Sequence, residues 1–211
     1  MNHYLYTVEA TRLGMLLHPT DEEKTILAEH RAYIQQLVAE QVAVFAGELT
    51  QRDSQHFGIV VFQAEDDASA KTILQADPAV SERMMRGCLY PHRVSLWNSH
   101  AMTLSEGQQH YFYRIRPVRP AMLSEGPTEQ EGSAMGQHFM YLKGLVEEGI
   151  FAYAGPTLNT DNSNFGAGLL RANSLDNAWQ IGNNDPAVIN RVMRLDIFEF
   201  TVFRFNPDFA I

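Results

Sequence analysis

The tetrapeptide Asp77-Pro78-Ala79-Val80 occurs a second time, 108 positions later, as Asp185-Pro186-Ala187-Val188. The same shift of 108 brings His30 onto His138. Internal repeats reveal the architecture of a chain before any single motif does. A repeat unit of about a hundred residues is the size of a small domain. The sequence therefore indicates a duplicated domain rather than a solenoid of short repeats.

The repeat extends over most of the chain. Residues 19–97 align with the second copy without a gap at the shift of 108. Upstream of this region, a shift of 107 aligns Tyr6 with Tyr113, so the second copy carries one inserted residue between Leu123 and Pro127. We expect a first domain over residues 1–98, a linker over 99–110 and a second domain over 111–211.

Each copy shows the same order of expected elements. In the first copy these are a strand over 3–9, a helix opened by the capping box Thr20-Asp-Glu-Glu23, strands over 42–50 and 56–63, a helix over 66–76, a helical turn after Asp77 and a strand over 87–97. The polar residues from Asn98 to His110 are expected to form the linker. The order β-α-β-β-α-β is that of a ferredoxin-like unit, so the predicted fold class is α+β.

The strands are apolar on both sides. Phe198, Phe200 and Val202 alternate with Ile197 and Phe203, whereas the helices of such a unit cover one face only. We therefore expect the two sheets to pack on each other across a pseudo-twofold axis, as an intramolecular pseudo-dimer. Further self-association of the chain stays open.

Composition restricts the function. The formal net charge is −9, which argues against binding to nucleic acid or to an anionic membrane surface. The single cysteine, Cys88, excludes an internal disulfide and a zinc–thiolate cluster. The sequence contains no apolar run long enough to span a bilayer. Its first residues, Met-Asn-His-Tyr-Leu-Tyr, lack the basic region and long apolar core typical of a signal peptide, so none is expected. A cytoplasmic protein that acts on a small molecule is the expectation.

Topology places several polar residues at one end of each unit. In the first copy Arg12 follows the first strand and His30 lies in the first half of the first helix. Asp53 lies in the turn between the strands over 42–50 and 56–63, and Asp77 ends the second helix. Their counterparts are Arg119, His138, Asp161 and Asp185. A histidine with a carboxylate and a nearby arginine suits general acid–base catalysis on an anionic substrate. Tyr33 and Tyr141 are further candidates for substrate binding.

Structural roles compete with these functional ones. An aspartate before a proline is a good helix N-cap, which suffices to explain Asp77 and Asp185. A histidine in an apolar helix stripe is often a core residue. The two tyrosines suit packing better than catalysis, and the arginines suit salt bridges. The two aspartates in the turns are typical turn formers.

No cofactor or metal is expected. One histidine and one aspartate in each copy are too few ligands for a metal site unless water or substrate completes the coordination shell. The sequence contains neither a glycine-rich phosphate loop nor a Gly-x-Ser-x-Gly nucleophile elbow.

Taken in order, the motifs of the second copy resemble the YCII-related domain. They are Tyr-Arg-Ile-Arg-Pro-Val-Arg-Pro, Pro-Thr-Glu-Gln-Glu, His138-Phe-Met-Tyr141, Glu-Glu-Gly, Ala-Gly-Pro-Thr, Phe-Gly and Asn-Asp185-Pro. The resemblance implies a dimeric α+β barrel with a pocket that contains the histidine and the aspartate before proline. It also implies kinship with lactone isomerases, dehydrohalogenases and cofactor-free monooxygenases.

The first copy departs from this pattern. Glu48, Gln41 and Leu13 replace Pro156, Gly149 and Pro120. We therefore expect the second site to be the more important one. Two functions stay open, a cofactor-independent isomerase or lyase that uses the His–Asp pair, and a non-catalytic protein that binds a small molecule in the same pockets.

Overall fold

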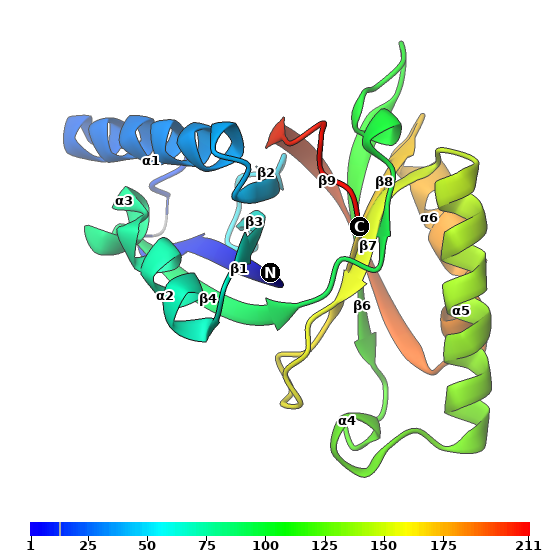
Figure 1. The fold of residues 1–211 in the computed structure, drawn as a ribbon. Helices are drawn as coiled ribbons and strands as arrows, with labels where there is room; N and C mark the ends of the chain where they lie inside the picture. The colour runs from blue at the N-terminus through cyan, green and yellow to red at the C-terminus, as the bar shows by residue number, and fades with distance from the viewer. Residues whose placement is uncertain (13) are drawn as a thin grey trace. The chain divides into compact units, whose positions relative to one another are not determined.

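The computed structural model describes residues 1–12 and 14–211, so the departure at Leu13 lies outside the described residues. Two compact units are present (Figure 1). The first contains residues 1–92 and 201–209, and the second contains residues 93–200 and 210–211. The predicted α+β class and the tandem arrangement of two βαββαβ units are confirmed.

The first unit is an antiparallel sheet with helices. Its elements are β1 (Asn2–Ala10), α1 (Asp21–Ala39), β2 (Ala43–Leu49), β3 (Gly58–Ala64), α2 (Asp67–Ala76), α3 (Pro78–Ser81) and β4 (Met85–His92). The strand order is β4-β1-β3-β2, and the C-terminal part of β9 (Met193–Phe205) continues the sheet beside β2. Strand β1 is central and pairs with β3 and β4.

The second unit repeats this plan. Its elements are β5 (Leu96–Trp97), the 3-10 helix η1 (Ser99–Met102), β6 (Gln109–Pro117), α4 (Met122–Glu125), α5 (Glu129–Glu147), β7 (Phe151–Pro156), β8 (Gly166–Ala172), α6 (Leu175–Asn183), α7 (Pro186–Ile189) and β9. The strand order is β9-β6-β8-β7-β5. The inserted residue of the second copy falls in the region of α4, which is followed by its C-cap residue Gly126 with a φ of 88°.

Both long helices begin as the sequence predicts. Thr20 and Thr128 each form a complete capping box with the glutamate three residues later. Both helices are followed by a residue in the left-handed region, Gly149 with a φ of 72° and Gln41 with a φ of 59°. Glycine adopts this conformation without a steric cost and glutamine does not, so the end of α1 is the strained one of the two.

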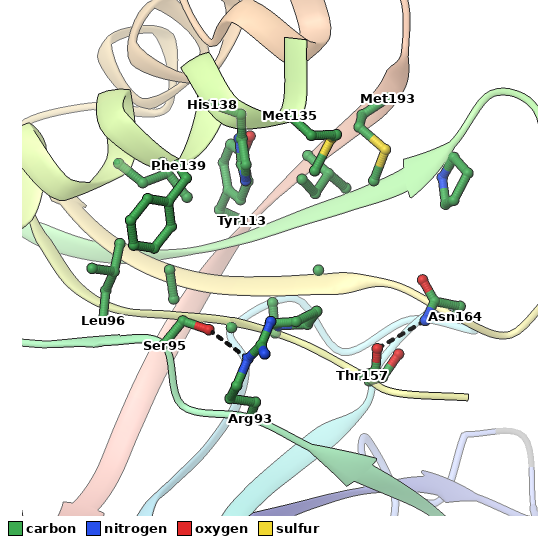
Figure 2. A pocket seen from close by; sticks show the side chains of 18 of the residues that line it. Arg93, Ser95, Leu96, Tyr113, Met135, His138, Phe139, Thr157, Asn164 and Met193 are labelled. Atoms are coloured by element: carbon green, nitrogen blue, oxygen red, sulfur yellow. Dashed lines mark hydrogen bonds between the residues drawn. The ribbon is translucent and has the colours of Figure 1, made fainter. Parts of the chain in front are cut away.

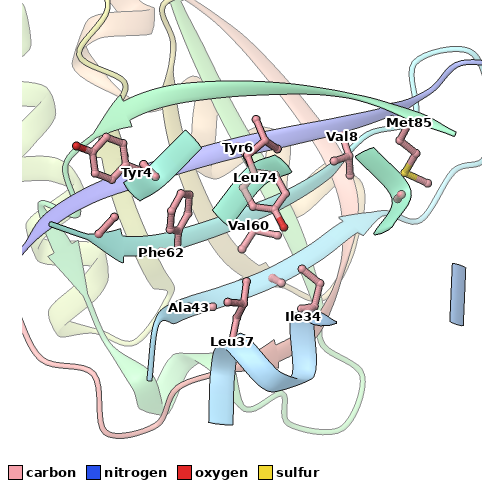
Figure 3. Packing of buried hydrophobic residues seen from close by; sticks show 14 of the residues in the cluster. Tyr4, Tyr6, Val8, Ile34, Leu37, Ala43, Val60, Phe62, Leu74 and Met85 are labelled. Carbon is pink, nitrogen blue, oxygen red and sulfur yellow. The ribbon is translucent and has the colours of Figure 1, made fainter. Parts of the chain in front are cut away.

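Alternation along the strands builds the core under the helices. In the first unit Tyr4, Tyr6 and Val8 of β1 are buried and pack with Ile34 and Leu37 of α1 (Figure 3). An equivalent cluster in the second unit contains Tyr111, Tyr113, Ile115, Leu142 and Val146. The first cluster places α1 and α3 on the same face of the sheet of the first unit, and the second cluster does the same for α5 and α7 in the second unit.

Two expectations near the middle of the chain are corrected. The strand predicted over 87–97 ends at His92, and residues 93–98 instead run along β7 in the second unit. The amide nitrogens of Arg93, Ser95 and Asn98 donate to carbonyl oxygens of β7. The polar linker contains η1, in which Ala101 and Met102 are buried.

Candidate functional site

His138 and Asp185 are hydrogen-bonded in the second unit. His138 lies on α5 and Asp185 is the N-cap of α7, and His138 Nδ1 lies 2.6 Å from Asp185 Oδ2. The hydroxyl of Tyr113, on β6, donates to the same Oδ2 at 2.7 Å. Asp185 is fully buried, whereas 13% of the His138 side chain is exposed. The histidine is thus the member of this group that can meet a ligand.

The first unit contains the same arrangement. His30 Nδ1 lies 2.7 Å from Asp77 Oδ1, and the hydroxyl of Tyr6 donates to Asp77 Oδ2 at 3.0 Å. The proximity that topology predicted for His30 with Asp77, and for His138 with Asp185, is therefore present in both copies. Sequence reasoning did not assign the tyrosines of β1 and β6 to this group, although the repeat aligned them.

The structural explanation for the aspartates also holds. Asp185 Oδ1 accepts the amide of Ala187 at 2.8 Å, and Asp77 Oδ1 accepts the amide of Ala79 at 3.0 Å. Each aspartate therefore caps a short helix with one oxygen. Asp185 uses its other oxygen for the histidine and the tyrosine. Capping and orientation of the histidine are compatible in one carboxylate, because it offers about four acceptor positions.

The surroundings of Asp185 determine which histidine nitrogen is available. Burial, and after it the negative charge of Asp185, raise the pKa of Tyr113 well above 10, so the phenol stays a proton donor. With Nδ1 directed at the carboxylate, the neutral histidine keeps its proton on Nδ1. Nε2 then carries the free lone pair, and in the described part of the chain it has no hydrogen-bond partner.

A cavity of about 320 Å³ adjoins His138 in the second unit. Figure 2 shows His138, Phe139 and Met135 of α5 on one side of it and Arg93 and Ser95 on the other. Most of the wall is apolar, and it includes Leu96, Ile115, Met122, Leu123, Leu142 and Met193. A cavity of this size and character suits a small molecule with an apolar body.

The equivalent cavity of the first unit is almost completely filled by side chains. It is lined by His30 but has a volume of only about 30 Å³. At the shift of 108, Phe203 stands where the second unit has Ser95, Ile59 replaces Ala167, and His56 replaces Asn164. Larger side chains therefore fill the first cavity. A water molecule occupies about this volume, so the first cavity has no room for a metabolite.

Arg12 and Arg119 do not join the His–Asp pairs. Arg119 forms a two-pronged ion pair with Glu131, at 2.7 and 2.8 Å, and its guanidinium also donates to Gly126 O. This contact and the capping hydrogen bond from Thr128 lower the pKa of Glu131 to about 2. Arg12 pairs with Glu23 in the same way. Both arginines brace a helix N-terminus, which differs from the expected contact with substrate.

The two tyrosines of the long helices are also occupied elsewhere. The hydroxyl of Tyr33 donates to Ile73 O at 2.7 Å, and that of Tyr141 donates to Ile181 O at 2.8 Å. The first hydroxyl thereby connects α1 to α2, and the second connects α5 to α6. Neither tyrosine lines the cavity beside the histidine of its unit, so packing describes their position better than the expected ligand contact.

Arg93 is a cavity residue that sequence reasoning missed. Its counterpart in the other copy is Thr201, so the repeat carried no signal for it. Its position depends on the pairing of residues 93–98 with β7, which is a long-range contact. The turn aspartates act as expected, since Asp53 and Asp161 each accept an amide two residues later.

Within residues 1–12 and 14–211, no group of three histidine, cysteine or acidic side chains is arranged to hold a metal ion. The helices of this same part of the chain are all too short or too polar to cross a membrane.

The YCII-related domain model matches the chain twice, over residues 4–97 and 111–201. The chain belongs to the YCII-related domain family. Its two copies are the tandem units that the repeat predicted. No curated protein shows significant similarity to this YCII-related chain.

Solved structures share the fold at low sequence identity. A heme-binding protein from Thermus thermophilus has a TM-score of 0.56 and 12% identity, over 97% of this chain and 92% of that chain. A chlorite dismutase mutant from Candidatus Nitrospira defluvii, in complex with cyanide, has a TM-score of 0.59 and 11% identity, over 97% and 92%. A candidate monooxygenase from Fusobacterium nucleatum has a TM-score of 0.60 and 10% identity, over 99% and 95%. At these identities the likeness concerns the fold alone.

Proposed function

We propose that the cavity of the second unit binds a small metabolite and that His138 is its general acid–base catalyst, in the cytoplasm. One observation carries the proposal. His138 lines a largely apolar cavity while its Nδ1 is held 2.6 Å from a fully buried carboxylate. An imidazole oriented in this way has one defined nitrogen for proton transfer.

The arrangement supports isomerisation or elimination. In our proposal Nε2 of His138 takes a proton from a carbon next to a carbonyl, or from the carbon adjacent to the one that carries a leaving group, and Asp185 stabilises the imidazolium that forms. In an isomerisation the proton then returns to another carbon. In an elimination the proton stays on the histidine, and the electron pair of the broken C–H bond forms a double bond as the leaving group departs from the neighbouring carbon. Tyr113 keeps Asp185 hydrogen-bonded throughout, because its raised pKa makes it a donor at neutral pH.

Heme does not fit this proposal, although one structural neighbour is a heme-binding protein. The cavity of about 320 Å³ lies at the lower end of the range of about 300–1,000 Å³ for small-molecule sites. A porphyrin with its propionates is larger than the ligands that such a cavity encloses. We therefore assign no heme to it.

The test begins with a thermal-shift screen of small carboxylates and phenols, since a bound ligand raises the melting temperature by mass action. Each hit is then incubated with the protein in D₂O and followed by proton NMR. We expect loss of the signal from an acidic C–H, or conversion of the compound. His138→Gln should abolish this reaction and retain a measurable affinity.

Binding without exchange or conversion of any hit would contradict the catalytic proposal. It would support the non-catalytic binding protein that the sequence left open. Exchange that persists in His138→Gln would show that another group moves the proton.

A further inference from the structure

The cavity of the second unit has an uneven distribution of charge. Arg93 is its one permanently charged lining residue, and no aspartate or glutamate is among the described residues that line it. The chain as a whole has a formal net charge of −9. A cation without an acidic neighbour in the wall of a cavity is an attractive position for an anion, the more so in an acidic protein.

The guanidinium of Arg93 has hydrogen-bond donors that no described residue accepts. It is exposed, and its Nε donates to Ser95 Oγ at a long distance of 3.3 Å. In the described part of the chain its two terminal nitrogens have no ion pair or hydrogen bond. This differs from Arg119, whose guanidinium is held by Glu131, Glu125 and Gly126 O. A free guanidinium can bind a carboxylate through two parallel hydrogen bonds.

Two other polar side chains in the wall already donate hydrogen bonds within the protein. The side-chain amide of Asn164 donates to the carbonyl oxygens of Thr157 and Asn159, and the Thr157 hydroxyl donates to Phe165 O. The remaining wall is apolar and includes the ring of Phe139. The site therefore offers one anion-binding group, one proton-transfer group and an apolar space between them.

We propose that Arg93 is the residue that recognises the anionic group of the ligand, and that the ligand is a small aromatic or branched carboxylate. The inference rests on the proposed function, whose substrate class it narrows. Arg93 takes the part that topology had assigned to Arg119. Figure 2 shows the Arg93 side chain directed toward the side of the cavity on which His138 lies.

The first unit shows how such a cavity is closed. Phe203 stands at the position of Ser95, Thr201 stands at the position of Arg93, and the remaining volume is about 30 Å³. Ser95→Phe should therefore fill the second cavity as Phe203 fills the first. It removes the space and keeps the Arg93 guanidinium, although it also removes the long hydrogen bond from Arg93 Nε to Ser95 Oγ. Arg93→Gln keeps the space and removes the charge, so the two parts of the proposal can be tested separately.

The experiment uses the full-length protein and two probes of similar shape, benzoate and benzamide, with affinities measured by calorimetry. Because a hydrogen bond to a charged group contributes about 1.5–3 kcal/mol, we expect benzoate to bind about 10- to 100-fold more tightly than benzamide. Arg93→Gln should remove this preference. Arg194→Gln, at an exposed arginine of β9 outside the cavity, changes the net charge equally and should retain it.

Ser95→Phe should abolish the binding of both probes. Circular dichroism checks that this variant is folded, and Ser95→Leu replaces it if the larger side chain prevents folding. If the filled variant loses both probes but Arg93→Gln keeps the benzoate preference, the anion assignment is wrong and the cavity proposal stands. If the filled variant binds both probes normally, the ligand lies elsewhere and the proposed function falls too. Failure of the unmodified protein to prefer benzoate, or to bind either probe at millimolar concentration, also overturns the carboxylate assignment.

Discussion

Asp185 combines two tasks in one buried side chain. It caps α7 through the Ala187 amide, and it accepts hydrogen bonds from His138 and Tyr113. A buried donor that loses its acceptor costs free energy, whereas an exposed one finds water. One carboxylate offers enough acceptor positions for all three donors, so the role of Asp185 as a helix cap and its role beside His138 do not exclude each other.

Replacement of Asp185 should therefore be costly. Asp185→Ala leaves three donors without an acceptor, and we expect the free energy of unfolding to fall by about 3 kcal/mol. Asp185→Asn keeps an oxygen for the Ala187 amide and should cost less. Urea denaturation of both variants measures the difference. A loss below about 1 kcal/mol for Asp185→Ala would show that water replaces the carboxylate and that the network is not a rigid one.

At the scale of elements, the ends of the two long helices carry the clearest differences between the copies. Helix α1 is followed by Gln41 in the left-handed region, and α5 is followed by Gly149 there. A side chain in this conformation costs about 1 kcal/mol or slightly more. We expect Gln41→Gly to raise the free energy of unfolding by about 1 kcal/mol.

The matched change is Gly149→Gln, which should lower stability by at least as much, since the new Cβ would also lie 3.0 Å from Arg171 Nη2. Chemical denaturation of the two variants gives both values. Destabilisation by Gln41→Gly would mean that the glutamine side chain contributes more than its backbone conformation costs.

The contribution of Glu131, near the N-terminus of α5, to the stability of the folded protein should depend on pH. Hydrogen bonds from Arg119 lower its pKa from 4.5 to about 2 in the folded protein. A lowered pKa stabilises the folded state fully above pH 4.5, and this contribution is lost as the pH falls toward about 2. Glu131→Gln removes the titration but keeps an oxygen for the capping box.

The melting temperatures of the unmodified protein and of Glu131→Gln should differ most at neutral pH and converge as the pH falls from about 4.5 toward about 2. Glu147→Gln, at the exposed end of the same helix, is the control for the removal of one carboxylate from α5. A constant gap between the unmodified protein and Glu131→Gln across this pH range would show that the ion pair does not stabilise the helix through its charge.

At the scale of the whole molecule, the units are not simple segments of sequence. Residues 201–209 belong to the first unit, and residues 93–98 belong to the second. The amide of Asn206 donates to Val44 O of β2 at 2.8 Å. A fragment of residues 1–98 would therefore lack an edge strand of its own sheet. The expectation that the two sheets face each other stays a prediction, and it would leave the same fragment with an uncovered apolar face.

For both reasons we expect the 1–98 fragment to aggregate or to self-associate. Expression of the fragment, followed by light scattering and urea denaturation, measures this. A monomeric fragment with a cooperative unfolding transition would contradict the expectation. It would show that residues 201–209 and the second unit are dispensable for the first.

Local signals explain what could be predicted from the sequence. The two capping boxes and the Asp-Pro caps each act over a few residues, and the repeat presents the same local signals twice, so together they predicted the βαββαβ order correctly. The closeness of His138 to Asp185 was also predictable, because the topology places the start of one helix and the end of another at the same end of a unit. The position of Arg93 was not predictable, because it depends on the pairing of residues 93–98 with β7.

We infer that only the second of the two similar His–Asp pairs contacts a ligand. The most direct test is the affinity of one carboxylate for His30→Ala and His138→Ala, after both variants are shown to be folded. We predict that His138→Ala weakens binding by about tenfold or more, because it removes a hydrogen-bond partner from the cavity of about 320 Å³. His30→Ala should leave affinity unchanged, because its cavity of about 30 Å³ admits no metabolite. An equal or larger loss from His30→Ala would contradict the claim.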